Sequence, residues 1–194
     1  MLFSDKAVAA CIRNNYVAAW ESVRPVPTVE IDFGNGAKLK RTVNGNIATY
    51  LCAPDGRVLD IIPGLNEPKA YLAALMDGLR LSEALPETVL AHHRGSRAVA
   101  RPRRLDRLDV GKAMVERPVK HALAPKTDAE LLAADTEVNQ TERKPLIHGI
   151  LAEKAYRPAE LTRRIYKDVL HVDLDNPYLG LVSAAFGGGA YGSR

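Results

Sequence analysis

Apolar and polar residues alternate along the first half of the chain in a pattern that predicts two β-hairpins. Residues 29–33 and 38–43 alternate on either side of a Gly-Asn-Gly turn at residues 34–36. Residues 48–53 and 57–62 are mostly apolar and flank a Pro-Asp-Gly turn. The turn chemistry and the alternation together indicate antiparallel pairing within each hairpin.

Helical spacing of apolar residues predicts a helix before and after this hairpin region. Residues 4–14 form the first helix, with Ser4 or Asp5 able to cap the free amides of its first turn. Residues 67–85 form the second helix, with Pro68 in its first turn. Residues 16–23 lie between the first helix and the first hairpin, and their aromatic and β-branched side chains predict a strand.

The second half of the chain returns to helical patterns after a basic, proline-broken stretch. Thr127 and Glu130 have the spacing of a capping box at the start of a helix, and Pro145 is placed to begin another. A third helix is expected from residue 157 to residue 171. Its apolar stripe consists of Leu161, Ile165, Val169 and Leu170.

These patterns divide the chain into four regions. We expect an α/β domain over residues 1–85, a basic connector rich in Pro and Arg over 86–126, a helical region over 127–182 and a flexible Gly-rich tail over 183–194.

Length and composition are those of a soluble globular protein. The chain has 194 residues, of which 46% are hydrophobic and 26% are charged, enough for one medium domain or a small domain with an extension. No apolar run approaches the roughly 20 residues of a membrane helix. The N-terminus lacks the basic start and apolar core of a signal peptide, so we expect a cytoplasmic protein.

Positive charge is concentrated in one segment, although the net charge is only +4. Residues 90–126 contain ten Lys and Arg against three acidic residues. The segment suits a solvated linker across the acidic remainder, a contact arm for a protein or membrane surface, or a nucleic-acid-binding arm without aromatic residues to stack on bases. The candidate partner-binding residues are Arg97, Arg101, Arg103, Arg104 and Arg107.

The two cysteines, Cys11 and Cys52, form no CxxC motif, which argues against a disulfide framework or a Cys-rich zinc site. Both are expected to be small buried hydrophobic residues. Cys11 is the better candidate for a reactive thiol, because Lys6 and Arg13 flank it.

The five histidines form no metal motif of the HxxxH or HExxH type, and we predict neither a metal nor a cofactor. His92 and His93 are expected to point in different directions on a helix, so we do not expect them to bind one metal together. A long-range site would combine His148 and His171 with Asp173 or Asp175. His121 lies in the basic segment.

The order of helix, strand, hairpin and helix in "FSDKAVAACIRNNYVAAWESV" and "IATYLCAPDGRVLDIIPGLNEPKAYLAAL" resembles the thioredoxin-like superfamily over roughly residues 3 to 80. The segments "RKPLIHGILAE" and "YKDVLHVDLDNPYLGL" resemble the C-terminal extensions of some bacterial members. The resemblance implies a thioredoxin-like α/β sheet with flanking helices, followed by a mostly helical extension.

Both catalytic hallmarks of that superfamily are missing here. The CxxC motif would lie at or before Met1, and Ile47 stands where the cis-proline is expected. The strand that precedes the motif is also missing. Either the hairpin at residues 29–43 takes its place, or a partner chain does, or the fold is only related to thioredoxin.

The sequence therefore favours a redox-inactive interaction or scaffold protein over an enzyme. One alternative is a thiol oxidoreductase that uses Cys11 alone, and another is nucleic-acid binding through the basic segment. A protein partner or self-association is expected, because a sheet that is short of a strand leaves edges exposed.

Overall fold

The computed structural model describes residues 2–25, 28–32, 34–36, 38–42, 47–97, 127–172 and 174–175. Within them the chain combines helices with antiparallel strands, which confirms a mixed α and β protein. The helical elements are η1 (Leu2–Ser4), α1 (Lys6–Asn15), α2 (Pro68–Ser82), α3 (Pro86–Arg97), α5 (Asp128–Val138), the π-helical turn η3 (Asn139–Arg143), α6 (Lys144–Leu151), α7 (Pro158–Arg164) and the π-helical turn η4 (Ile165–Val169). The strands are β1 (Thr28–Asp32), β2 (Lys38–Thr42), β3 (Ala48–Cys52) and β4 (Val58–Pro63).

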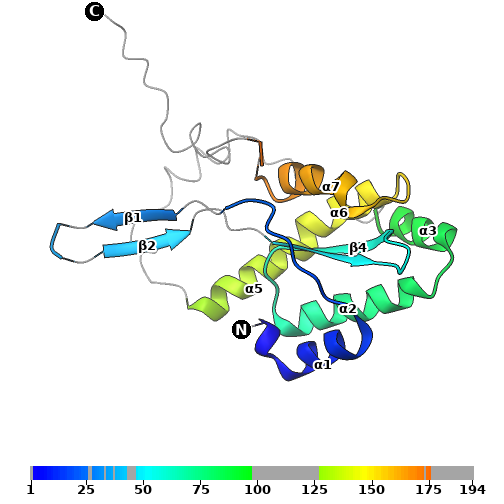
Figure 1. The fold of residues 1–194 in the computed structure, drawn as a ribbon, viewed down its shortest axis with the longest axis horizontal. Coiled ribbons are helices and arrows are strands. Elements are labelled where there is room, and N and C mark those ends of the chain that lie inside the picture. The colour runs from blue at the N-terminus through cyan, green and yellow to red at the C-terminus, as the bar shows by residue number, and fades with distance from the viewer. Residues whose placement is uncertain are drawn as a thin grey trace, which may run out of the picture.

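The β3–β4 hairpin is the centre of the molecule and confirms the second predicted hairpin. Its strands pair antiparallel, and Gly56 supplies the positive φ of 84° that the turn requires. Every residue of β4 is buried, because helices cover both faces of the hairpin (Figure 1).

The first face of the hairpin packs against α1 and α2. Leu51 and Ile62 from the strands share a core with Val8 and Cys11 of α1 and Leu75 of α2. The Asp5 side chain caps α1 by accepting from the amides of Ala7 and Val8 at 3.0 Å, as expected.

The second face packs against the C-terminal helices α6 and α7 and the turn η4. Val58 and Ile61 of β4 lie in this core together with the predicted apolar stripe of the third helix, all of whose members are at most 2% exposed: Leu161, Ile165, Val169 and Leu170. The alternation of Ile61 and Ile62 between the two faces follows the period of a strand.

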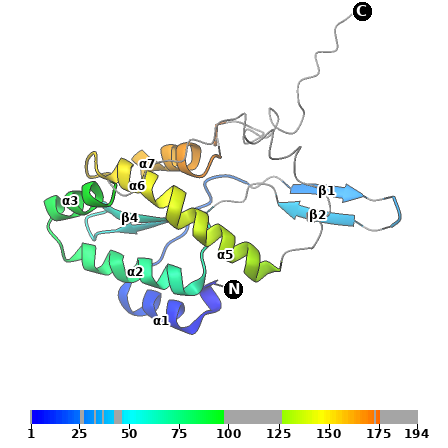
Figure 2. The ribbon, with the colours of Figure 1, turned by 180° about the vertical axis from the view of Figure 1, so that it is seen from behind.

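The segments α5, η3 and α6 form one continuous helix that passes along the hairpin (Figures 1 and 2). The Thr127–Glu130 capping box starts it, as predicted. Pro145 lies in the first turn of α6 but does not start a separate helix, because the π-helical turn before it accommodates the missing amide.

The β1–β2 hairpin confirms the first predicted hairpin but forms a separate two-stranded sheet, which points away from the helices (Figure 2). Gly34 and Gly36 adopt positive φ in its turn. The thioredoxin-like arrangement of the sheet remains a prediction.

Two segments differ from the sequence-based expectation. Residues 16–22 have no strand assignment, because no described strand lies beside them to complete a ladder. Residues 86–97 form helix α3, although their composition favoured a connector; the helix is held by its packing on α6. The tail at residues 183–194 lies outside the described residues.

Candidate functional site

The Cys11 thiol lies in the core between α1 and α2. The residue is 8% exposed, and its Sγ is 4.0 Å from the Sδ of Met76. A reactive thiol needs an electropositive and partly exposed setting, whereas Cys11 sits among apolar side chains. The expected structural role of Cys11 fits this position.

Cys52 is exposed, so the expectation that it is buried is wrong. It ends β3 beside Leu51, and since side chains alternate along a strand, Leu51 takes the buried side. The thiol itself is partly enclosed, and this desolvation raises its pKa above the ordinary value. Neither cysteine has the properties of an activated nucleophile.

Of the basic candidate residues, the structure describes Arg97 alone. It lies exposed in the last turn of α3, and its charge contributes to lowering the pKa of Glu153. The remaining candidates, Arg101, Arg103, Arg104 and Arg107, lie outside the described residues.

Residues 17–23 expose apolar side chains on a stretch of chain that is neither helix nor strand. Val17 is fully exposed and Trp20 is 88% exposed. No backbone hydrogen bond joins these residues to another part of the chain that the structure describes. The segment therefore presents both apolar surface and open backbone groups.

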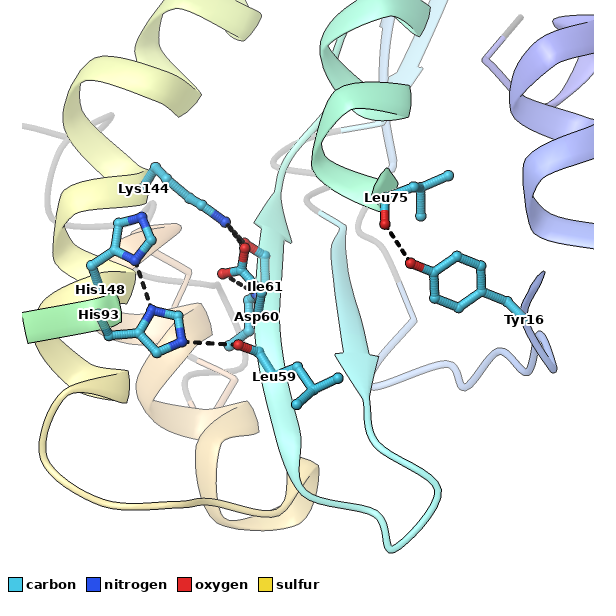
Figure 3. A network of polar contacts seen from close by, with 8 residues as sticks. All are labelled: Tyr16, Leu59, Asp60, Ile61, Leu75, His93, Lys144 and His148. Carbon is cyan, nitrogen blue, oxygen red and sulfur yellow. Dashed lines mark hydrogen bonds and ion pairs between the residues drawn. The ribbon is translucent and has the colours of Figure 1, made fainter. Parts of the chain in front are cut away.

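Side chains anchor this segment at both ends. The Tyr16 hydroxyl donates to the carbonyl of Leu75 at 2.6 Å, and burial raises the pKa of Tyr16 to about 12 (Figure 3). The Arg24 guanidinium donates to the carbonyl of Leu174 at 3.3 Å. The exposed segment is thus held in place between two fixed points.

Side chains from α3 and α6 satisfy the edge of β4 that faces away from β3. The pairing register shifts between Leu51 and Cys52, which leaves Leu59 without an opposite residue in β3. The Leu59 carbonyl accepts a hydrogen bond from Nε2 of His93 at 2.9 Å, and the Ile61 carbonyl accepts one from Nζ of Lys144 at 3.1 Å.

Three histidines meet where α3 and α6 contact each other: His92 and His93 from α3 and His148 from α6. Nδ1 of His93 lies 2.8 Å from Nδ1 of His148. Figure 3 shows this contact between the two rings. The ring of His92 completes the group, with its centroid 5.1 Å from that of His93 and 5.6 Å from that of His148. One nitrogen from each residue falls within 4.8 Å of the other two.

The hydrogen bonds assign the protons on two of these rings. A carbonyl only accepts, so Nε2 of His93 carries a proton and Nδ1 of neutral His93 is an acceptor. Nδ1 of His148 therefore donates, which leaves a lone pair on its Nε2. Desolvation lowers the pKa of His93 and lowers that of His148 to about 4, so both rings are neutral at pH 7.

An ion pair between the buried carboxylate of Asp60 and the partly buried ammonium of Lys144 lies beside the histidines. The carboxylate of Asp60 accepts from the ammonium of Lys144 and from the amide of Ile61 (Figure 3). The Asp60 charge raises the pKa of His148 and the Lys144 charge lowers it. Both charges of the ion pair therefore act on the protonation of His148.

The sequence patterns missed this cluster. Adjacent positions on a helix are about 100° apart, but the imidazole rings of His92 and His93 still come together around His148. Among the described residues, His171 is not part of the group, and Asp173 lies outside them. The doublet His92-His93 was the available signal, but nothing in its spacing identified His148 as the third member.

No helix in the described ranges is both long and apolar enough to cross a membrane. Comparisons with protein-family models, curated proteins and solved structures gave no match. The resemblance to thioredoxin-like proteins thus rests on the residues and motifs of this chain alone.

Proposed function

We propose that this protein is a non-catalytic interaction protein whose contact strand is residues 17–23. The observation that carries the proposal is the exposure of Val17 and Trp20 on a segment that is anchored at both ends. Large exposed apolar side chains next to open backbone groups are the features by which one chain adds a strand to another. The sequence of this segment also favours a strand.

The surroundings of the thiols support a role without redox chemistry. Cys11 is enclosed by apolar side chains, and desolvation disfavours the thiolate of Cys52. We regard the α1, β3, β4 and α2 elements as a thioredoxin-like scaffold that lacks CxxC and has Ile47 in place of the cis-proline. This scaffold positions the contact strand through Tyr16.

The contact strand fits a second copy of the chain. Antiparallel pairing of two copies about Trp20 places Val17 opposite Val23 twice and the two Trp20 side chains opposite each other. An isologous contact of this kind requires a surface that is complementary to itself, which this pattern provides. The product is a two-fold symmetric dimer.

Trp20 is the single tryptophan of the chain, so its fluorescence reports the proposed contact directly. We expect its emission to move to shorter wavelength as the protein concentration rises, because dimerisation removes the indole from water. The change should be absent in Val17→Lys, which places a charge in the contact. Leu85→Lys, at another exposed apolar position, is the matched control and should behave as wild type.

Emission that stays constant up to about 1 mM would contradict the proposal, since this range detects even a binding free energy of about −4 kcal/mol.

A further inference from the structure

We infer that His92, His93 and His148 form a binding site for a divalent transition-metal ion, most directly Zn²⁺. The site lies between α3 and α6 and is separate from the contact strand, so the inference goes beyond the proposed function.

The spacing of the three side chains is close to that of a coordination shell. One nitrogen from each lies within 4.8 Å of the others, and the Nδ1 atoms of His93 and His148 are 2.8 Å apart. Two nitrogens bound to one tetrahedral Zn²⁺ at about 2.0–2.1 Å are about 3.3 Å apart. A separation larger by about half an ångström would therefore admit the metal in place of the proton on Nδ1 of His148, which moves to Nε2 of the same ring.

Hydrogen bonding already orients one ring as a metal ligand. Nε2 of His93 donates to the carbonyl of Leu59, which leaves Nδ1 as the lone-pair atom that faces His148. Histidines that bind metals commonly donate their second N–H to a carbonyl or carboxylate in this way, which fixes the tautomer and the ring orientation. His93 is 1% exposed, so its packing holds this orientation.

Charge and access are compatible with a cation. The carboxylate of Asp60 lies close enough to raise the pKa of both His93 and His148, and its partner Lys144 offsets part of this effect. His92 is exposed and gives the site an opening to solvent.

The donor set selects the class of metal. Three imidazole nitrogens suit Zn²⁺, Cu²⁺ and Ni²⁺, whereas Ca²⁺ and Mg²⁺ require oxygen ligands. Three protein ligands leave a fourth tetrahedral position for water or for an external ligand.

The test is a titration of untagged protein with Zn²⁺ against a chromophoric chelator, together with the absorption spectrum of Co²⁺ added in its place. We expect one Zn²⁺ per chain, a Co²⁺ spectrum typical of tetrahedral nitrogen ligation, and shifts of the imidazole NMR signals of His92, His93 and His148. His92→Gln should weaken Zn²⁺ binding by at least about tenfold, because it removes a ligand. It should leave the fold intact, because the side chain is exposed.

His148→Gln should weaken binding by a similar factor, while its amide can still donate to Nδ1 of His93. The matched controls are His171→Asn, where asparagine tolerates the φ of 57°, and His121→Gln; both should bind Zn²⁺ like wild type. The inference is overturned if folded wild-type protein binds neither Zn²⁺ nor Co²⁺, which would make the cluster a proton-sharing pair. It is also overturned if binding is unaffected by both His92→Gln and His148→Gln.

Discussion

Gly64 shows how a single residue joins two parts of the fold. It has a positive φ of 61° just after β4, and a Cβ atom there would lie 2.8 Å from Oδ1 of Asn139 and 2.9 Å from Nη1 of Arg143. Asn139 is almost fully buried and donates to the carbonyl of Leu65 at 2.6 Å. Close approach of the η3 turn to this loop therefore requires glycine.

Gly64→Ala should lower the free energy of unfolding by about 1–3 kcal/mol, because it combines an unfavourable φ with a clash. Urea denaturation measures this change. Gly95→Ala is the control, since Gly95 lies in helix α3 with open space at the Cβ position, and it should stabilise the protein by about 0.5–1 kcal/mol. Equal effects of the two substitutions would contradict this account of Gly64.

Thiol reactivity gives a second test at the residue scale. Because desolvation raises the pKa of Cys52, its thiolate fraction at pH 8 is smaller than that of a free cysteine. We expect iodoacetamide to alkylate Cys52 more slowly than a cysteine in a short peptide, and to alkylate buried Cys11 only on unfolding. Faster alkylation of either thiol than of the peptide would indicate activation and favour the oxidoreductase alternative.

At the scale of elements, two side chains and one backbone carbonyl complete the outer edge of β4. His93 and Lys144 satisfy the carbonyls of Leu59 and Ile61, and the amide of Val58 donates to the carbonyl of Tyr156 at 2.8 Å. These contacts attach α3 and α6 to the hairpin.

Lys144→Met should destabilise the protein by about 3–5 kcal/mol, because it leaves the carboxylate of Asp60 buried without its partner. The double variant Asp60→Asn/Lys144→Met should recover part of this loss, since no buried charge remains. Thermal and urea unfolding of both variants provide the comparison. A double variant that is less stable than Lys144→Met would show that the ion pair is not the cause.

Acidification should weaken the contact between α3 and α6. The pKa values of His93 and His148 are lowered in the folded state, so below the ordinary value of 6.5 the unfolded state binds more protons. In metal-free buffer, the free energy of unfolding should fall from pH 6.5 towards pH 4, by at most about 1.4 kcal/mol per pH unit for each histidine. His148→Gln should reduce this slope, and an unchanged slope would contradict the assignment.

Local sequence patterns predicted the elements better than the contacts between them. The Gly-Asn-Gly and Pro-Asp-Gly turns and the Thr127–Glu130 capping box depend on neighbouring residues, and all three were predicted. The contact of His93 with His148 joins residues 55 positions apart and depends on the packing of α3 on α6. No local pattern carries that information. Residues 16–23 have a strand-forming sequence, but a strand also needs a partner.

At the scale of the whole molecule, the hairpin at the centre is enclosed by helices, while residues 17–23 belong to none of the three buried clusters. Tyr16 and Arg24 fix this segment instead of letting it fold over the body. Ordering an exposed strand in advance lowers the entropic cost of binding, which favours a role as a contact surface.

Sedimentation velocity of the wild-type protein and of Trp20→Lys, over a range of concentrations, tests the central claim most directly. The account predicts that the wild-type protein shifts from monomer to dimer as concentration rises, and that Trp20→Lys stays monomeric with an unchanged circular dichroism spectrum. A wild-type protein that remains monomeric up to about 1 mM, or a Trp20→Lys variant that dimerises equally well, would contradict it.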